Sequence, residues 1–154
     1  MFDRILFPTD GSDGAAVALE HVLDLARAHD ATLHVLNVAD TTVHSTTRVG
    51  GEVIDALETA GESIVAETDA AASERGVSTV TEVLQGGVPE TIVDYADEYG
   101  IDLVVMPTKG RTGLERLVLG SVTERVLRSA STPVLTINPD ATQMRYPYES
   151  VLVP

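Results

Sequence analysis

Short apolar runs alternate along this chain with longer segments in which apolar residues recur at helical spacing. The pattern begins with the run 4–7, closed by Pro8, and continues with apolar residues from Ala15 to Ala26 that share one helical face. Such alternation is typical of βαβ units, which build a parallel sheet with helices packed on it. The sequence therefore predicts an α/β fold.

The same pattern predicts five strands and four helices. Strands are expected at 4–7, 32–38, 79–84, 103–106 and 133–137, and helices at about 15–26, 53–64, 89–99 and 121–129. Thr79–Leu84 alternates polar and apolar residues, which favours a half-exposed strand at an edge of the sheet. Leu103–Met106 is continuously apolar, as expected for a strand covered on both faces. Periodicity alone does not supply the strand order.

Length and composition set further bounds. The 154 residues suit one domain, and 44% of them are hydrophobic, which is enough for a core. Cysteine is absent, which excludes disulfides, thiolate metal sites and cysteine nucleophiles. We find no signal-peptide pattern after Met1 and no apolar stretch long enough to span a bilayer, so the protein is expected to be cytoplasmic.

The charge balance is strongly acidic. Twenty-four Asp and Glu face 10 basic residues, of which Lys109 is the only lysine, and the formal charge is −14. This charge would repel nucleic acid and anionic membranes, so neither is expected as a partner. We interpret it as a halophilic adaptation to molar salt, where the Debye length falls to about 3 Å and self-repulsion is screened. The alternative, a moderately acidic mesophilic protein, would ordinarily keep several surface lysines.

A long glycine-containing segment, 107–121, follows the apolar run 103–106. Ser121 and Glu124 have the spacing of a capping box, which predicts that a helix begins at Ser121. A helix N-terminus suits a phosphate, and Gly110 and Gly120 let backbone amides approach an anion. The plain alternative is that Ser121 only caps the helix and the glycines only turn the loop. The position of this long loop, after a buried strand, favours a functional role.

Standard catalytic and nucleotide motifs are absent from the sequence. It contains no GxxxxGK[ST] phosphate loop, no GxGxxG after the first predicted strand, and no GxSxG nucleophile elbow. The four histidines lack metal-site spacing, so structural or solvated roles are expected for them. No catalytic residue is predicted, and any ATP hydrolysis is expected to be slow.

Several segments together resemble the ATP-binding branch of the universal stress protein family. They are the opening Ile5–Ser12, His34–Val35 on the second predicted strand, Gly110 followed after nine residues by Gly120–Ser121, then Val122–Val126 and Pro133–Leu135. The resemblance spans essentially 2–137. It implies a single doubly wound, Rossmann-like parallel sheet of five strands in the order 3-2-1-4-5, with four helices.

The resemblance also implies a ligand, which would be ATP or another adenine nucleotide, with Mg²⁺ bridging its phosphates. The adenine and ribose would be enclosed by Pro8, Thr9, Asp10, Val35 and Met106, and the phosphates would be held by Gly110, Arg111, Gly120, Ser121, Val122 and Thr123. Lys109 is expected to face the phosphates. Without the family context, Asp10 could equally be the N-terminal cap of the first helix.

Pro107 departs from the family motif, which has a glycine at this position. Proline has no amide donor and fixes φ at about −65°, so a backbone contact with the nucleotide would be lost. Three functional interpretations stay open. The favoured one is a nucleotide-binding, regulatory stress-response module, and the others are a nucleotide-free dimeric scaffold and a slow ATPase or phosphotransferase.

The domain is predicted to span 1–138, which leaves a tail at 139–154. Within the tail, Tyr148–Pro154 repeats the residue character of Phe2–Pro8, which is explained by chance, by an added strand or by the remnant of a second repeat. The fifth strand, Pro133–Ile137, would lie at a sheet edge although it is apolar, and such an edge needs cover. Fifth strands commonly pair in this family, so a homodimer is expected.

Overall fold

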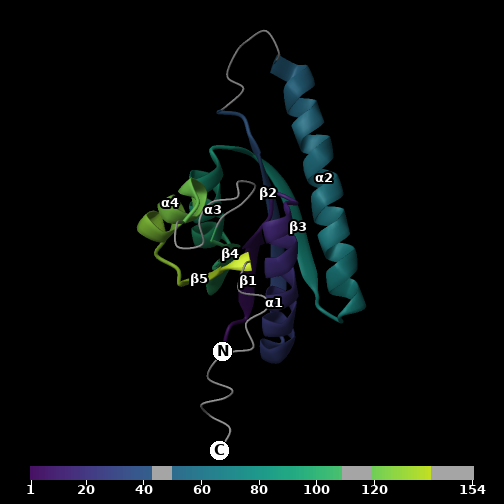
Figure 1. Ribbon diagram of the computed structural model, residues 1–154, viewed down its shortest axis with the longest axis vertical. Coiled ribbons are helices and arrows are strands. Elements are labelled where there is room, and N and C mark those ends of the chain that lie inside the picture. The colour runs from purple at the N-terminus through teal and green to yellow at the C-terminus, as the bar shows by residue number, and fades with distance from the viewer. Residues whose placement is uncertain (43–49, 109–118, 140–154) are drawn as a thin grey trace, which may run out of the picture.

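The computed structural model describes residues 1–42, 50–108 and 119–139. In this part of the chain the strands are β1 Arg4–Pro8, β2 Thr32–Asp40, β3 Thr79–Gly86, β4 Leu103–Pro107 and β5 Val134–Ile137. The helices are α1 Asp13–His29, α2 Gly50–Glu74, α3 Val88–Glu98 and α4 Ser121–Ser129. Strands and helices alternate in the predicted order (Figure 1).

All strand pairings are parallel, and the sheet order is β3-β2-β1-β4-β5, which confirms the doubly wound fold. The chain moves from β1 outward to β3 and then returns to place β4 on the other side of β1. The strand order therefore reverses between β1 and β4. In open α/β sheets such a switch point leaves a crevice outside the carboxyl ends of the strands, where ligands bind.

Helices cover both faces of the sheet, α1 and α2 on one side and α3 and α4 on the other (Figure 1). Successive side chains of β1 pack on opposite faces of the sheet, because side chains alternate in direction along a strand. Ile5 and Phe7 pack in the cluster that includes α1 and α2, and Leu6 packs in the cluster that includes α3 and α4. All three side chains are fully buried. The central strands are thus covered on both faces.

The two edge strands differ in their surroundings. β3 is only partly buried, as its alternating sequence predicts, and it is packed against β2 and α2. β5 forms the opposite edge, where Leu135 is 43% exposed although it is apolar. The outer side of β5 therefore presents both apolar side chain and unpaired strand backbone within the described structure.

Some boundaries differ from the predicted ones. β2 runs to Asp40, two residues beyond the predicted end, because β3 continues beside it and Asp40 pairs with Gly86. α2 begins at Gly50 rather than near Val53, so the Gly-rich start is helical instead of frayed. None of the described helices is both long and apolar enough to cross a bilayer. The segment 148–154, which repeats the character of β1, lies outside the described residues.

Candidate functional site

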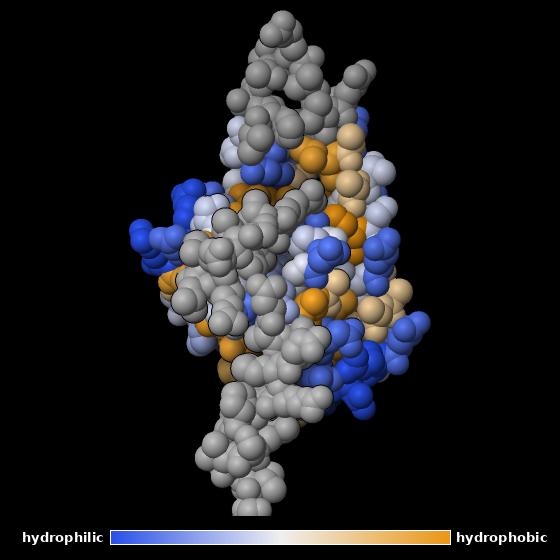
Figure 2. Space-filling model, in the orientation of Figure 1, coloured by the Kyte–Doolittle hydropathy of each residue, from blue (hydrophilic) through white to orange (hydrophobic). Residues whose placement is uncertain are grey.

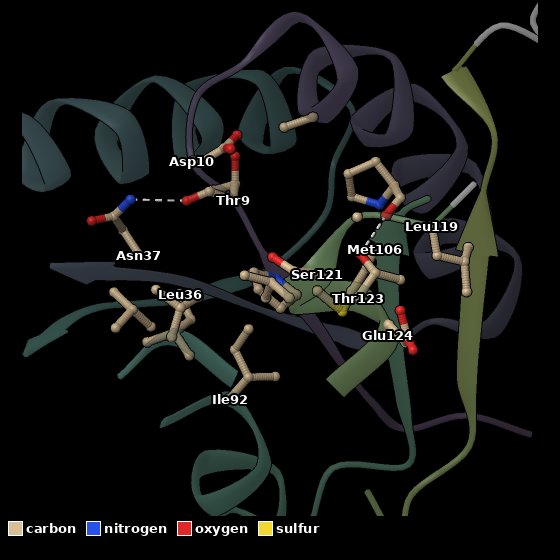
Figure 3. Close-up of a pocket in the computed structure, with 17 residues that line it drawn as sticks. Thr9, Asp10, Leu36, Asn37, Ile92, Met106, Leu119, Ser121, Thr123 and Glu124 are labelled. Carbon is tan, nitrogen blue, oxygen red and sulfur yellow. Dashed lines mark hydrogen bonds between the residues drawn. The ribbon is translucent and has the colours of Figure 1, made fainter. Parts of the chain in front are cut away.

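A cavity of about 650 Å³ lies at the carboxyl ends of β1, β2 and β4 (Figure 3). Its walls come from the end of β1 and the following loop, from β2, from the beginning of α3, and from the end of β4 and the start of α4. The lining residues are Pro8, Thr9, Asp10, Ala15, Leu36, Asn37, Val38, Val88, Ile92, Met106, Pro107, Leu119, Gly120, Ser121, Val122, Thr123 and Glu124. This volume is typical of small-molecule sites.

The loop after β1 places a carboxylate on the cavity wall. Asp10 is partly buried there, and its Oδ1 accepts a hydrogen bond of 2.9 Å from the backbone N–H of Ser12. The Thr9 hydroxyl oxygen accepts a bond of 3.2 Å from the N–H of Gly11. Gly11 has a φ of +73°, a conformation that glycine adopts without steric cost. These local bonds shape the turn that presents Asp10.

Ser12, rather than Asp10, caps α1. The Ser12 side chain accepts a hydrogen bond of 3.2 Å from the backbone N–H of Ala15. The alternative that Asp10 is the helix cap is therefore wrong. The reason is local: the Asp10 carboxylate accepts from the N–H of Ser12, two residues ahead, in an Asx-type turn, and the helix begins after Ser12.

The N-terminus of α4 borders the other side of the cavity. The helix begins at Ser121 as predicted, but the capping-box prediction is wrong, because Gly120 occupies the cap position. Ser121 is one residue too late for that role, and no side-chain cap bonds this helix start within the described residues. Gly120 is held instead by its backbone N–H, which donates to the Thr108 carbonyl at 2.6 Å.

A buried hydrogen bond anchors the first turn of α4. The Thr123 hydroxyl donates to the Pro107 carbonyl at 2.9 Å, and Thr123 is only 4% exposed (Figure 3). This bond ties α4 to the last residue of β4 beside the cavity. The hydroxyl proton of Thr123 is thus committed to the protein, and its role at the cavity is to position the helix.

The described cavity wall is acidic where it is charged. Asp10 and Glu124 line it, and no lysine or arginine is among the described lining residues. The Glu124 carboxylate pairs with Arg128 at 2.7 Å one helical turn away. Lys109, Gly110 and Arg111, which were expected at the phosphates, lie outside the described residues.

One residue expected at the site lies elsewhere. Val35 is fully buried in the core cluster on the α1 and α2 side, with its β1 neighbour Phe7. The Val35 side chain is not among those that line the cavity, and β2 contributes Leu36, Asn37 and Val38 to the wall instead. Apolar residues that sequence reasoning missed are Leu36, Val38, Val88, Ile92 and Leu119. For Leu36 and Val38, the alternation of side chains along β2 was the available signal.

The titratable groups with shifted pKa values lie outside the cavity lining. His34 on β2 lies with its Nδ1 2.8 Å from the hydroxyl oxygen of Tyr95 on α3, and both side chains are buried. Burial lowers the pKa of His34, helped by the positive charge of Arg4, and burial raises the pKa of Tyr95 to about 12. A neutral His34 hydrogen-bonded to the tyrosine hydroxyl has a structural role. At the base of β1, hydrogen bonds from the backbone N–H groups of Arg4 and Asp3 lower the pKa of Asp102.

Known proteins resemble this chain in both sequence and architecture. The profile of the universal stress protein family matches residues 1–138. Universal stress protein MJ0531 of Methanocaldococcus jannaschii is 36% identical over 140 residues, which cover 89% of this chain and 82% of that protein. The structure of universal stress protein UspA from Lactobacillus plantarum has a TM-score of 0.81 at 28% identity, and the match covers 89% of this chain and 98% of that chain.

Two other solved structures contain nucleotides. One is a universal stress protein in complex with cAMP, with a TM-score of 0.68, and the match covers 90% of this chain and 98% of that chain. The other is the universal stress protein from Archaeoglobus fulgidus in complex with dAMP, also at 0.68, with coverages of 89% and 98%. Both are 23% identical to this chain, a level at which the similarity establishes a common fold.

Proposed function

This chain belongs to the universal stress protein family, and we propose that its cavity binds an adenine nucleotide, with ATP as the leading candidate, so that the protein acts as a regulatory stress-response module. The observation that carries the proposal is the composition of one cavity. An apolar wall, a carboxylate at the switch point of the sheet, and a helix N-terminus that no described side chain caps all border the same space. These are the surfaces that a base, a ribose and a phosphate require.

The apolar wall suits the base. Leu36 and Val38 come from β2, and Val88 and Ile92 come from the start of α3. When a flat adenine ring is buried against these side chains, its apolar surface is removed from water. This burial is the main favourable contribution to binding in such sites. Met106 and Pro107, at the end of β4, add to the apolar part of the lining.

The Asp10 carboxylate suits the ribose. It lies after β1 at the switch point, where an acidic side chain can accept hydrogen bonds from the two ribose hydroxyls. Hydrogen bonds to an ionised acceptor are stronger than neutral ones. We therefore assign Asp10 to ribose recognition, with Pro8 and Thr9 beside it.

The start of α4 suits the phosphates. The amides of Ser121 and Val122 lie in the first turn, where helical N–H groups have no partner within the helix and the helix dipole favours an anion. The Ser121 hydroxyl is at the exposed surface of this turn. In this proposal Gly120 permits the close approach, and Lys109, Gly110 and Arg111 supply further contacts from the adjoining loop.

Mg²⁺ would accompany a polyphosphate. The described residues contain no group of three or more His, Cys, Asp or Glu side chains that could hold a metal ion by themselves. Carboxylates line the cavity at Asp10 and Glu124, and this ion is usually bound by one or two carboxylates together with substrate phosphates, so the phosphates would supply most of its ligands. The ion would also neutralise charge between the phosphates and these two carboxylates.

Nucleotide complexes of two proteins with the same fold support the choice of ligand class, since one holds cAMP and the other dAMP. Among the described lining residues there is no serine, histidine and carboxylate arrangement for rapid chemistry. We therefore propose ligand binding, with at most slow hydrolysis. We further propose that the apolar edge of β5 pairs with the same strand of a second copy, which would cover Leu135.

Thermal unfolding with and without ligand tests the binding proposal. A nucleotide at about 100 times its dissociation constant should stabilise the fold by about 2.7 kcal/mol. The ligands are ATP with Mg²⁺, AMP, cAMP and GTP, and GTP should stabilise least if the base is recognised. Ser121→Ala should weaken ATP binding, whereas Ser129→Ala, at the other end of α4, should not. If no nucleotide stabilises the wild-type protein, the nucleotide-free scaffold becomes the preferred function.

A further inference from the structure

Asn37 is a buried polar side chain on the wall of the cavity. It lies on β2 and is only 7% exposed. Its Nδ2 donates to the backbone carbonyl of Thr9 at 2.9 Å, as Figure 3 shows. An amide buried in this way costs free energy unless it is hydrogen-bonded, so this bond fixes the side chain in one orientation.

The bond occurs where the pairing of β1 with β2 ends. The last paired residues are Pro8 and Leu36, and the Thr9 N–H still donates to the Leu36 carbonyl at 2.9 Å. A continuing parallel ladder would next give the Thr9 carbonyl a backbone donor from β2. The side chain of Asn37 supplies a donor instead. The chain is thereby held to β2 through Thr9 and turns away immediately afterwards, which presents Asp10 to the cavity.

Helix α2 leaves room for this arrangement at one glycine. A Cβ on Gly61 would lie 2.4 Å from Oδ1 of Asn37 and 3.0 Å from a methyl carbon of Val83. Gly61 is buried in the interior of α2, where glycine is unfavourable for the helix. Its presence there is explained by the close approach, because any side chain would push against the Asn37 amide. Asn37 is therefore held by its hydrogen bond to Thr9, and its amide fits against α2 because Gly61 has no side chain.

We propose that Asn37 is a positioning residue for the nucleotide site: its bond to the Thr9 carbonyl sets the loop that presents Asp10 to the ribose. This inference rests on the proposed function and extends it. Asn37 acts through Thr9 and Asp10, and Gly61 is required so that Asn37 keeps its position. Affinity for a ribonucleotide thus depends on the contact between Asn37 of β2 and Gly61 of α2.

Asn37→Asp is the direct test, because it keeps the shape but replaces the donor with an oxygen that repels the Thr9 carbonyl. Losing one hydrogen bond and leaving its partner unpaired predicts a roughly tenfold loss of ATP affinity, measured by calorimetry. The loss should be much smaller for 2′,3′-dideoxy-ATP, which lacks the hydroxyls assigned to Asp10. With Asp10→Asn the effects should be non-additive, since both changes remove the same ribose contact.

Gly61→Ala is the second variant, and Gly61 is not itself among the residues that line the cavity. It should lower ATP affinity although alanine favours the helix, and Ser63→Ala, at an exposed position of α2, is the matched control that should leave affinity unchanged. A Gly61→Ala protein with wild-type affinity, together with an Asn37→Asp protein that loses ATP and dideoxy-ATP equally, would overturn the inference.

Amide hydrogen exchange without ligand separates this inference from the proposed function. Asn37→Asp and Gly61→Ala should speed exchange at Gly11 and Ser12, whose N–H groups donate within the loop. If wild-type protein binds no nucleotide but these amides lose protection in both variants, the proposed function fails while the positioning of the loop stands. If their protection is unchanged in both variants, the positioning role is wrong whatever the protein binds.

Discussion

The bond between Thr123 and Pro107 leads to a prediction about both stability and binding. Thr123→Val keeps the shape of the side chain but removes the hydroxyl that donates to the Pro107 carbonyl at 2.9 Å. Because Thr123 is 4% exposed, water has little access to the carbonyl left without this donor. An unsatisfied buried acceptor costs about 1–3 kcal/mol of unfolding free energy. For a domain of this size, that lowers Tm by about 2–12 °C.

Urea unfolding followed by circular dichroism measures this loss, and the m-value should stay unchanged if only stability is affected. Nucleotide affinity should fall as well, because the bond holds the first turn of α4 against β4. Ser121→Ala is the control, since this exposed side chain makes no cap bond within the described structure. Its unfolding free energy should stay within about 0.5 kcal/mol of wild type while its affinity falls. A Thr123→Val protein as stable as wild type would refute the anchoring role.

Three further predictions concern pH, assembly and salt. Burial lowers the pKa of His34, so its contribution to the unfolding free energy is present above pH 6.5 and is lost as pH falls toward the folded-state pKa. In this pH range, the unfolding free energy measured with urea should depend less on pH in His34→Leu than in wild type. Leu135→Asp, at the exposed edge of β5, should convert a dimer to a monomer in sedimentation, and an unchanged mass would contradict the β5 interface. The charge of −14 predicts that unfolding free energy rises steeply with KCl, whereas full stability at low salt would contradict halophilic adaptation.

The sequence predicted the elements well because their signals are local. Continuous apolar runs marked the buried strands, and the polar alternation of Thr79–Leu84 marked β3 as an edge. Strand order could not be predicted from local patterns, since it depends on contacts between distant segments, and it came from the family resemblance instead. Boundaries failed where a neighbour decides them, as at Asp40, which stays in β2 because β3 pairs with it.

The site was harder to predict than the fold. Ser121 and Glu124 have capping-box spacing, yet Gly120 takes the cap position, held through its backbone by Thr108. Val35 and Leu36 are adjacent in sequence but face opposite sides of the sheet. The family motif points to Val35, whereas the side chain that lines the cavity is that of Leu36. The bond of Asn37 to Thr9 spans 28 residues and has no local pattern that could reveal it.

Equilibrium dialysis against labelled ATP with Mg²⁺, in molar KCl, tests the central claim most directly because it measures occupancy without relying on heat or unfolding. The account predicts saturable binding of one nucleotide per chain, competed by AMP more strongly than by GTP, and strongly weakened in Asp10→Ala. Saturable ATP binding that is unchanged in both Asp10→Ala and Ser121→Ala would contradict the assignment of the cavity. The absence of binding by any adenine nucleotide at millimolar concentration would contradict the proposed function itself.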